Sequence, residues 1–437
     1  MSRNRIYLCL AHMSEAGLEQ KYIKEAFDTN WVVPLGPNVN GFEKDLEEFV
    51  GEEKRVVALS SGTAAVHLAL LNCGVKPGDE VIVQSFTFCA STHPVMYLGA
   101  MPVLVDSEPD TWNIDPELLE KAIIDRKEKT GKYPKAIVPV ALYGMPYKAD
   151  RIMEIANKYG IPVVEDAAEG LGSRYKGQVL GTFGKYGVLS FNGNKMITTS
   201  GGGALITAND DEWREIMMYA TQYRESYPYY QHEKIGYNYR MSNICAGIGR
   251  GQMTIVNDHI AHHKHVQKMY EELLADVPGV HVHSQPTNSD YDSNYWLCTI
   301  TIDPEVKVKG QEDAYKTIVT GAVGGAAGVI HAASSAHTDC EPNANVEAMR
   351  VALDKAQIEA RPLWKPMHMQ PCYRRGNVKI EKCNNANISC VTSESSVAYV
   401  NGISEVLFKV GMCLPAGPYV SDDDVRYIVD TIKANIL

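Results

Sequence analysis

Short runs of β-branched and apolar residues alternate with amphipathic segments between about residues 50 and 205, and this alternation limits the possible folds most strongly. Runs of strand length that are separated by helix-like patterns are typical of βαβ units, in which parallel strands are covered by helices on both faces. We therefore predict an α/β protein with a mostly parallel sheet. The runs read RVVALS, EVIVQSF, MPVLVD, KAIVPVAL and IPVVEDAA.

The length of 437 residues indicates a second domain, since single hydrophobic cores rarely grow so large. We predict a large domain with an N-terminal arm over 1–255 and a smaller C-terminal α/β domain over 256–437, with an insertion around 318–345 where small residues replace the periodic pattern. The final SDDDVRYIVDTIKANIL is typical of a helix that begins after an N-cap at Ser421 and carries acids in its first turn.

Charge and cysteine content exclude several classes of protein. The net charge of -11 argues against nucleic-acid binding, which needs clustered basic residues. The ten cysteines are scattered without a CxxC pair, so we expect neither a metal site nor a disulfide framework. The apolar patch near the N-terminus is too short for a signal peptide or a membrane span, so we expect a soluble cytoplasmic protein.

Two motifs follow predicted strands. In ALSSGTAAVHLAL, the pair Gly62 and Thr63 begins a helix, and a helix N-terminus with a small residue can bind a phosphate. In IPVVEDAAEGLGS, Glu165 and Asp166 end a buried strand, where open α/β sheets bind ligands. Taken alone, each motif is equally consistent with an ordinary helix cap.

The stretch SFNGNKMITTSGGGAL places Lys195 between a polar turn and a glycine-rich segment. A lysine that forms a Schiff base needs a fixed position and room for a flat ring, which neighbouring glycines provide. Together with the carboxylate at Asp166 and the helix terminus at Gly62, this lysine meets the three needs of pyridoxal phosphate. The alternative is a surface lysine, as most lysines are. Either Phe86 or Phe88 of QSFTFCAS can stack on the ring, and the other is a core aromatic.

These motifs, in this order, resemble the DegT-like sugar aminotransferases, which are fold-type I pyridoxal phosphate enzymes, and the resemblance covers nearly the whole chain. Within that family the likeness is closest to enzymes that aminate UDP-linked 2-acetamido-4-keto-6-deoxyglucose. The stretches that carry the resemblance are PLGPNVNGFEKDLEEFVG, SSGTAAVHLAL, SFTFCAS, EDAAEGLGS, GTFGKYGVLSFNGNKMITTSGGGAL, IGYNYRMSNICAGIGRGQM, EARPLWKPMH and GMCLPAG.

The resemblance implies a role for each matched residue. Lys195 would form the Schiff base and carry protons, Asp166 would pair with the pyridine nitrogen, and Phe88 would stack on the ring. Glu169, where the family often has His or Gln, would lie near the ring hydroxyl. The cofactor phosphate would be held by Gly62, Thr63, Ser190 and, from the neighbouring subunit of a homodimer with shared sites, Asn238.

The implied reaction moves the amino group of L-glutamate to C4 of a UDP-linked 4-keto-6-deoxy-N-acetylhexosamine. Alternatives are a GDP- or dTDP-linked sugar, a 3-keto sugar, or a non-catalytic cofactor-binding regulatory protein on the same fold. A dehydratase branch of the family has histidine at the lysine position, and Lys195 argues against it. The stretches at 318–345 and 376–396 are longer than the resemblance predicts.

Overall fold

The computed structural model of the chain describes residues 4–51, 53–315, 341–382 and 388–437. Its main feature is one large sheet, formed by a six-stranded and a four-stranded group that isolated bridges join at Ile137 to Val163 and at Val140 to Asp166. The joined order is β14-β15-β16-β3-β2-β4-β5-β8-β9-β1. These strands are β1 (Arg55–Leu59), β2 (Glu80–Gln84), β3 (Met101–Val105), β4 (Ile137–Val138), β5 (Val164–Asp166), β8 (Tyr186–Ser190), β9 (Gly203–Thr207), β14 (Lys379–Lys382), β15 (Ser389–Thr392) and β16 (Val397–Val400).

Most strands of this sheet run in one direction. β2 pairs in parallel with β3 and β4, and β5 pairs in parallel with β8. β9 is antiparallel to both β8 and β1, so β1 regains the common direction. The prediction of a mostly parallel α/β sheet is confirmed. Because β1, β2, β5 and β8 run in the same direction, their carboxyl ends lie along one edge of the sheet.

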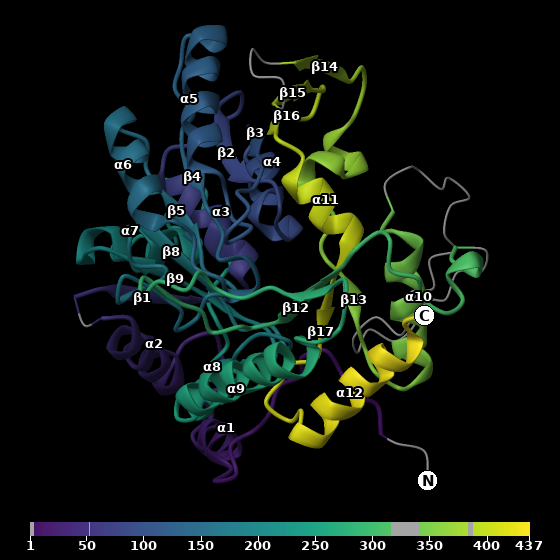
Figure 1. The fold of residues 1–437 in the computed structure, drawn as a ribbon. Coiled ribbons are helices and arrows are strands. Elements are labelled where there is room, and N and C mark those ends of the chain that lie inside the picture. The colour runs from purple at the N-terminus through teal and green to yellow at the C-terminus, as the bar shows by residue number, and fades with distance from the viewer. Residues whose placement is uncertain (1–3, 52, 316–340, 383–387) are drawn as a thin grey trace.

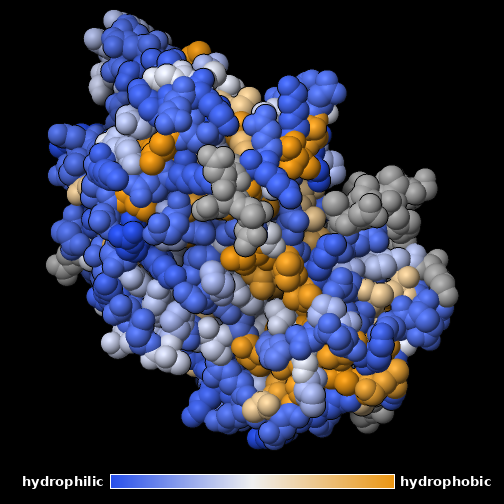
Figure 2. Space-filling model, turned by 45° about the horizontal axis from the view of Figure 1, so that its top comes forward, coloured by the Kyte–Doolittle hydropathy of each residue, from blue (hydrophilic) through white to orange (hydrophobic). Residues whose placement is uncertain are grey.

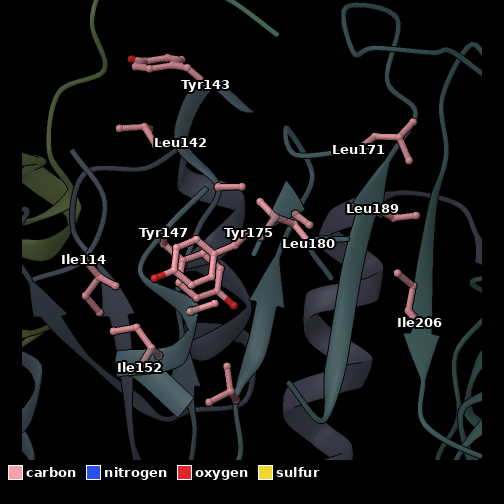
Figure 3. Close-up of a cluster of buried hydrophobic side chains, with 14 of the residues drawn as sticks. Ile114, Leu142, Tyr143, Tyr147, Ile152, Leu171, Tyr175, Leu180, Leu189 and Ile206 are labelled. Atoms are coloured by element: carbon pink, nitrogen blue, oxygen red, sulfur yellow. The ribbon is translucent and has the colours of Figure 1, made fainter. Parts of the chain in front are cut away.

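Alternate residues of the strands face two different cores, which is why the strands are apolar throughout. Val57 and Leu59 of β1 pack in the cluster that contains α3, whereas Val56 and Ala58 pack in the cluster that contains α2. Figure 3 shows part of the second cluster, where Ile152 of α6 lies near Ile114 and Tyr147, and Leu189 of β8 lies near Ile206 of β9. The helices of this part are α1 (Leu18–Asp28), α2 (Pro37–Val50), α3 (Gly62–Asn72), α4 (His93–Tyr97), α5 (Pro116–Thr130), α6 (Ala149–Tyr159), α7 (Asp210–Ala220) and α8 (Asn243–Met253).

A smaller sheet in the order β10-β12-β17-β13 packs against helices of the C-terminal part (Figure 1). The last helix, α12, begins after its predicted N-cap Ser421, whose hydroxyl accepts a hydrogen bond from the Asp424 amide. The Asp424 side chain in turn accepts a hydrogen bond from the Ser421 amide, which completes a capping box. These elements are α9 (Val256–Leu274), α10 (Ala344–Lys355), α12 (Asp422–Asn435), β10 (Val280–Val282), β12 (Cys298–Ile302), β13 (Arg361–Pro362) and β17 (Gly411–Leu414). None of the helices in the described ranges is long and apolar enough to span a membrane.

Two further sets of pairings join strands of the C-terminal half to strands of the N-terminal half. A small sheet combines β11 (Tyr291–Asp292) with β6 (Arg174–Tyr175) and β7 (Gln178–Val179). In addition, β16 pairs in parallel with β3, and β14 and β15 extend that edge, so the long stretch at 376–396 forms strands around the undescribed residues 383–387.

Hydrogen bonds to a buried carboxylate strengthen the junction of β3 with the C-terminal half. Asp106, which directly follows β3, accepts hydrogen bonds from the backbone N–H groups of Asn401, Gly402 and Ser404, and the last of these lies in the first turn of α11 (Ile403–Val410). The division into domains at 255 and 256 stays a prediction. Of the predicted insertion around 318–345, residues 318–340 lie outside the part of the chain that the structure describes.

Candidate active site

The residues that the sequence singled out follow four strands whose carboxyl ends share one edge of the large sheet. Gly62 begins α3 after β1, Phe88 follows β2, Asp166 ends β5 and Ser190 ends β8. The carboxyl edge of a parallel sheet is where open α/β folds bind ligands, because loops from several strands converge there. The fold thus brings to one edge residues from segments that together span more than a hundred positions of the chain, from Gly62 to Ser190.

The start of α3 is built to hold an anion. The Ser61 hydroxyl accepts a hydrogen bond from the Ala64 amide at 3.0 Å and so caps the helix. The first amides of a helix have no partner within it, so those of Gly62 and Thr63 are available to a phosphate. A Cβ at Gly62 would lie 3.1 Å from the Ser190 Cβ, which shows that Ser190 borders the same seat and that the seat is narrow. This geometry fits a phosphate group.

Asp166 is a buried carboxylate with hydroxyl and amide donors. It accepts a hydrogen bond from the Ser91 hydroxyl at 2.6 Å and one from the Ala168 amide at 3.2 Å, and the Thr87 hydroxyl oxygen lies 2.7 Å from that of Ser91. Burial raises the pKa of Asp166, although the bonds from Ser91 and Ala168 and the charge of Lys195 act to lower it. A buried carboxylate of this kind fits a cationic partner such as a protonated pyridine nitrogen.

Lys195 lies inside the site and not at the surface. Its side chain is only 12% exposed, and its Nζ lies 3.2 Å from Oε1 of Glu169 and 3.9 Å from the ring centroid of Trp296. The alternative of an ordinary surface lysine therefore does not hold. An amine that is largely buried beside Glu169, and whose charge lowers the pKa of the buried Asp166, has the kind of neighbours that pyridoxal phosphate needs.

Glu169 is the second buried carboxylate of the site. Its Oε2 accepts the Tyr143 amide at 2.7 Å, while its Oε1 faces Lys195. Burial raises the pKa of Glu169 to about 7, although the positive charge of Lys195 and the Tyr143 amide act to lower it. Near neutral pH the carboxyl group therefore exchanges a proton readily and can accept or donate a hydrogen bond.

The structure separates the two phenylalanines of QSFTFCAS. Phe86 is fully buried, whereas Phe88 is 52% exposed, with its ring centroid 5.5 Å from that of Trp364. Phe88 is thus the one that is free to stack on a ligand.

Asn238 is exposed and lies beside β1, because the neighbouring Tyr239 carbonyl accepts the Ser60 amide. In the described part of the chain its side chain makes no hydrogen bond to the other predicted site residues.

Ser91, Trp296 and Trp364 also contribute to the site, and the sequence did not assign them roles. Ser91 is the last residue of SFTFCAS, so its position in a matched motif was a signal. Trp364 lies in RPLWKPMH, but its contact with Phe88 could not be predicted from that stretch of sequence. Trp296 is one of only five tryptophans, but nothing local to it indicates that it reaches Lys195 from a hundred residues away.

A family model for the DegT/DnrJ/EryC1/StrS aminotransferase family matches residues 14–326 of the chain. The chain belongs to this family. The aminotransferase is 39% identical over 432 residues to EpsN of Bacillus subtilis (strain 168), whose name describes a pyridoxal phosphate-dependent aminotransferase, with 98% of this chain and 95% of EpsN covered. It is 31% identical over 427 residues to the GDP-perosamine synthase of Escherichia coli O157:H7, with 98% of each chain covered.

Among solved structures, a DegT DnrJ EryC1 StrS aminotransferase from Brucella abortus superposes with a TM-score of 0.76 at 25% identity, covering 96% of this chain and 95% of that one. The aminotransferase therefore has the fold-type I architecture, and its cofactor is pyridoxal phosphate.

We predict that Glu169 makes the stability of the cofactor-free protein depend on pH. Because its pKa is raised by folding, the stability that its proton contributes is present at acidic pH and is lost as the pH rises through about 7. Between about pH 4.5 and 8 the wild type should lose on the order of 3 kcal/mol relative to Glu169→Gln, which keeps the shape but cannot ionise. Urea unfolding of both proteins across this range measures the difference.

The matched control is Glu48→Gln, at an exposed position of α2, for which the difference from wild type should stay flat. The prediction is contradicted if the difference in unfolding free energy between wild type and Glu169→Gln does not change with pH. It is also contradicted if the wild type becomes more stable than Glu169→Gln as the pH rises.

Proposed function

We propose that the aminotransferase acts on a nucleotide-linked keto sugar and uses L-glutamate as the amino donor. In full, it would transfer the amino group to C4 of a UDP-linked 4-keto-6-deoxy-N-acetylhexosamine and release 2-oxoglutarate and UDP-4-amino-4,6-dideoxy-N-acetylglucosamine. The observation that carries the transferase reaction is the buried Lys195 amine beside Glu169, in the same site as Asp166. The choice of UDP sugar rests on EDAAEGLGS, FNGNKMITTSGGGAL and RPLWKPMH.

Each site residue has one task in this proposal. When bound, pyridoxal phosphate supplies an electron sink for the carbon that exchanges its proton. Asp166 keeps the pyridine nitrogen protonated, because a buried carboxylate favours a cation next to it. Lys195 Nζ takes the proton that leaves the α-carbon of glutamate and, in the second half of the reaction, returns a proton to C4 of the sugar. Gly62, Thr63 and Ser190 hold the phosphate.

Glu169 and Phe88 complete the assignment. Glu169 would face the ring hydroxyl of the cofactor, and its raised pKa allows a shared proton there. Phe88 would cover one face of the ring, because its own ring is exposed and is supported by Trp364.

A GDP-linked keto sugar is the second candidate substrate, and the likeness to GDP-perosamine synthase over 98% of both chains favours it. The discriminating experiment offers the loaded enzyme, with glutamate, a panel of UDP-, GDP- and dTDP-linked keto sugars that differ in the position of the carbonyl.

We predict that the UDP-linked 4-keto sugar is aminated at C4 with a kcat/KM at least about a hundredfold above the others, because a site that hydrogen-bonds one base leaves its polar groups unpaired with another. Lys195→Ala should lower kcat by about 10⁴-fold, since it removes the group that moves the proton. Mass and NMR analysis of the products identifies the aminated carbon. Preference for a GDP sugar would select the second candidate, and full turnover by Lys195→Ala would contradict the proposal.

We also propose a cytoplasmic homodimer whose sites are shared between subunits. Large apolar side chains are exposed in the described part of the chain, and Figure 2 shows such side chains gathered in the middle and lower part of one face among hydrophilic ones. Exposed apolar area of this kind marks interaction surfaces. The exposed side chains include Phe27, Val32, Leu35, Tyr97, Tyr230 and Ile235.

Mixing two variants of lowered activity tests the shared site. Lys195→Ala and Asn238→Ala should each lower activity alone. After unfolding and refolding together, activity should recover to about a quarter of the wild-type value, because half of the dimers are mixed and each has one intact site. A mixture of Lys195→Ala with Asp166→Ala is the control and should recover nothing if both residues serve their own subunit's site. No recovery in the first mixture would contradict the role of Asn238.

A further inference from the structure

The chain between β11 and β12 is fastened to the loops of the active site. The Ser293 hydroxyl donates to the Gly144 carbonyl at 3.0 Å. The side-chain Nδ2 of Asn294 donates to the backbone carbonyls of Glu169 and Leu171, each at 2.9 Å. Gly144 has a φ of 93°, and a Cβ there would lie 1.9 Å from the Asn294 Oδ1, so the close approach requires glycine.

Trp296, at the end of this segment, reaches the turn that carries Lys195. Its backbone N–H donates to Oδ1 of Asn294 at 2.8 Å, and its indole N–H donates to the Asn194 carbonyl at 2.7 Å. The indole is 2% exposed, and its ring centroid lies 3.9 Å from Nζ of Lys195. The amine is therefore held between the face of an indole and the Glu169 carboxylate.

Two histidines one turn apart on α9 hold both chain segments in place. Nδ1 of His259 lies 3.1 Å from the Met196 carbonyl, next to Lys195, and Nδ1 of His263 lies 3.0 Å from the Tyr295 carbonyl, next to Trp296. Burial lowers the pKa of both histidines, that of His263 to about 3, so both are neutral and Nδ1–H donates to the carbonyl. One rigid helix thus fixes the lysine turn and the tryptophan relative to each other.

We propose that Trp296 is a positioning residue for Lys195. Its indole N–H fixes the turn, and its ring face holds the charged amine by a cation–π contact while the carboxylate of Glu169 holds it from another direction. The inference rests on the proposed function only in that Lys195 is the amine that moves the proton. It does not depend on which sugar is the substrate.

The test measures how fast Lys195 is acylated by a water-soluble N-hydroxysuccinimide ester in the cofactor-free protein, with peptide mass spectrometry as the readout. Trp296→Leu should speed the labelling of Lys195 about fivefold, and Trp296→Phe, which keeps a ring but loses the N–H, about twofold. The exposed Lys24 of the same molecules should be labelled at an unchanged rate. If Trp296→Leu does not fold, the Phe variant alone carries the comparison.

Trp213 offers a matched control on α7. Its indole N–H also donates to a backbone carbonyl, that of Val56 at 3.1 Å, and a cation, Arg55, lies 5.4 Å from its ring centroid. Trp213→Leu and Trp213→Phe should leave the labelling of Lys195 unchanged. Wild-type labelling of Lys195 in both Trp296 variants, or an equal change in the Trp213 variants, overturns the inference, whatever the sugar panel shows.

Discussion

The ion pair between Lys195 and Glu169 is the interaction on which the site depends. Neither group is accessible enough for water to solvate it fully, so Lys195 relies on the Glu169 carboxylate, and Glu169 relies on Lys195 and on the Tyr143 backbone N–H. The pair is possible only because the loops after β5 and β8 leave the sheet at the same edge. The same edge carries the seat for a phosphate and the carboxylate of Asp166. The common direction of these strands therefore determines which side chains meet at the site.

The two carboxylates of the site differ because their neighbours differ. Asp166 accepts a hydrogen bond from the Ser91 hydroxyl, and that hydroxyl is itself hydrogen-bonded to the Thr87 hydroxyl. Glu169 instead faces the amine of Lys195 directly. Such a division lets one acid keep a cation in place while the other shares a proton near neutral pH. The proposed reaction needs both tasks in one site, since the same residues would serve both of its halves.

Much of this could be predicted from the sequence because the signals are local. The strand that ends at Asp166, the helix that starts at Gly62 and the cap at Ser421 each depend on a few neighbouring residues. The contacts of Ser91 with Asp166 and of Trp296 with Lys195 could not be predicted, because they join segments 75 residues apart in the first case and different sheets in the second. The pairing of β16 with β3 was missed for the same reason, since nothing near residue 397 indicates which edge it joins.

The most direct test of the account is the visible absorption of the pyridoxal phosphate-loaded protein when L-glutamate is added without any sugar. We expect the visible band to be lost and about one 2-oxoglutarate to form per subunit, because the first half of the reaction needs only the site described above. Adding the keto sugar should then restore the band. A loaded protein whose band does not change with glutamate, and which forms no 2-oxoglutarate, would contradict the account.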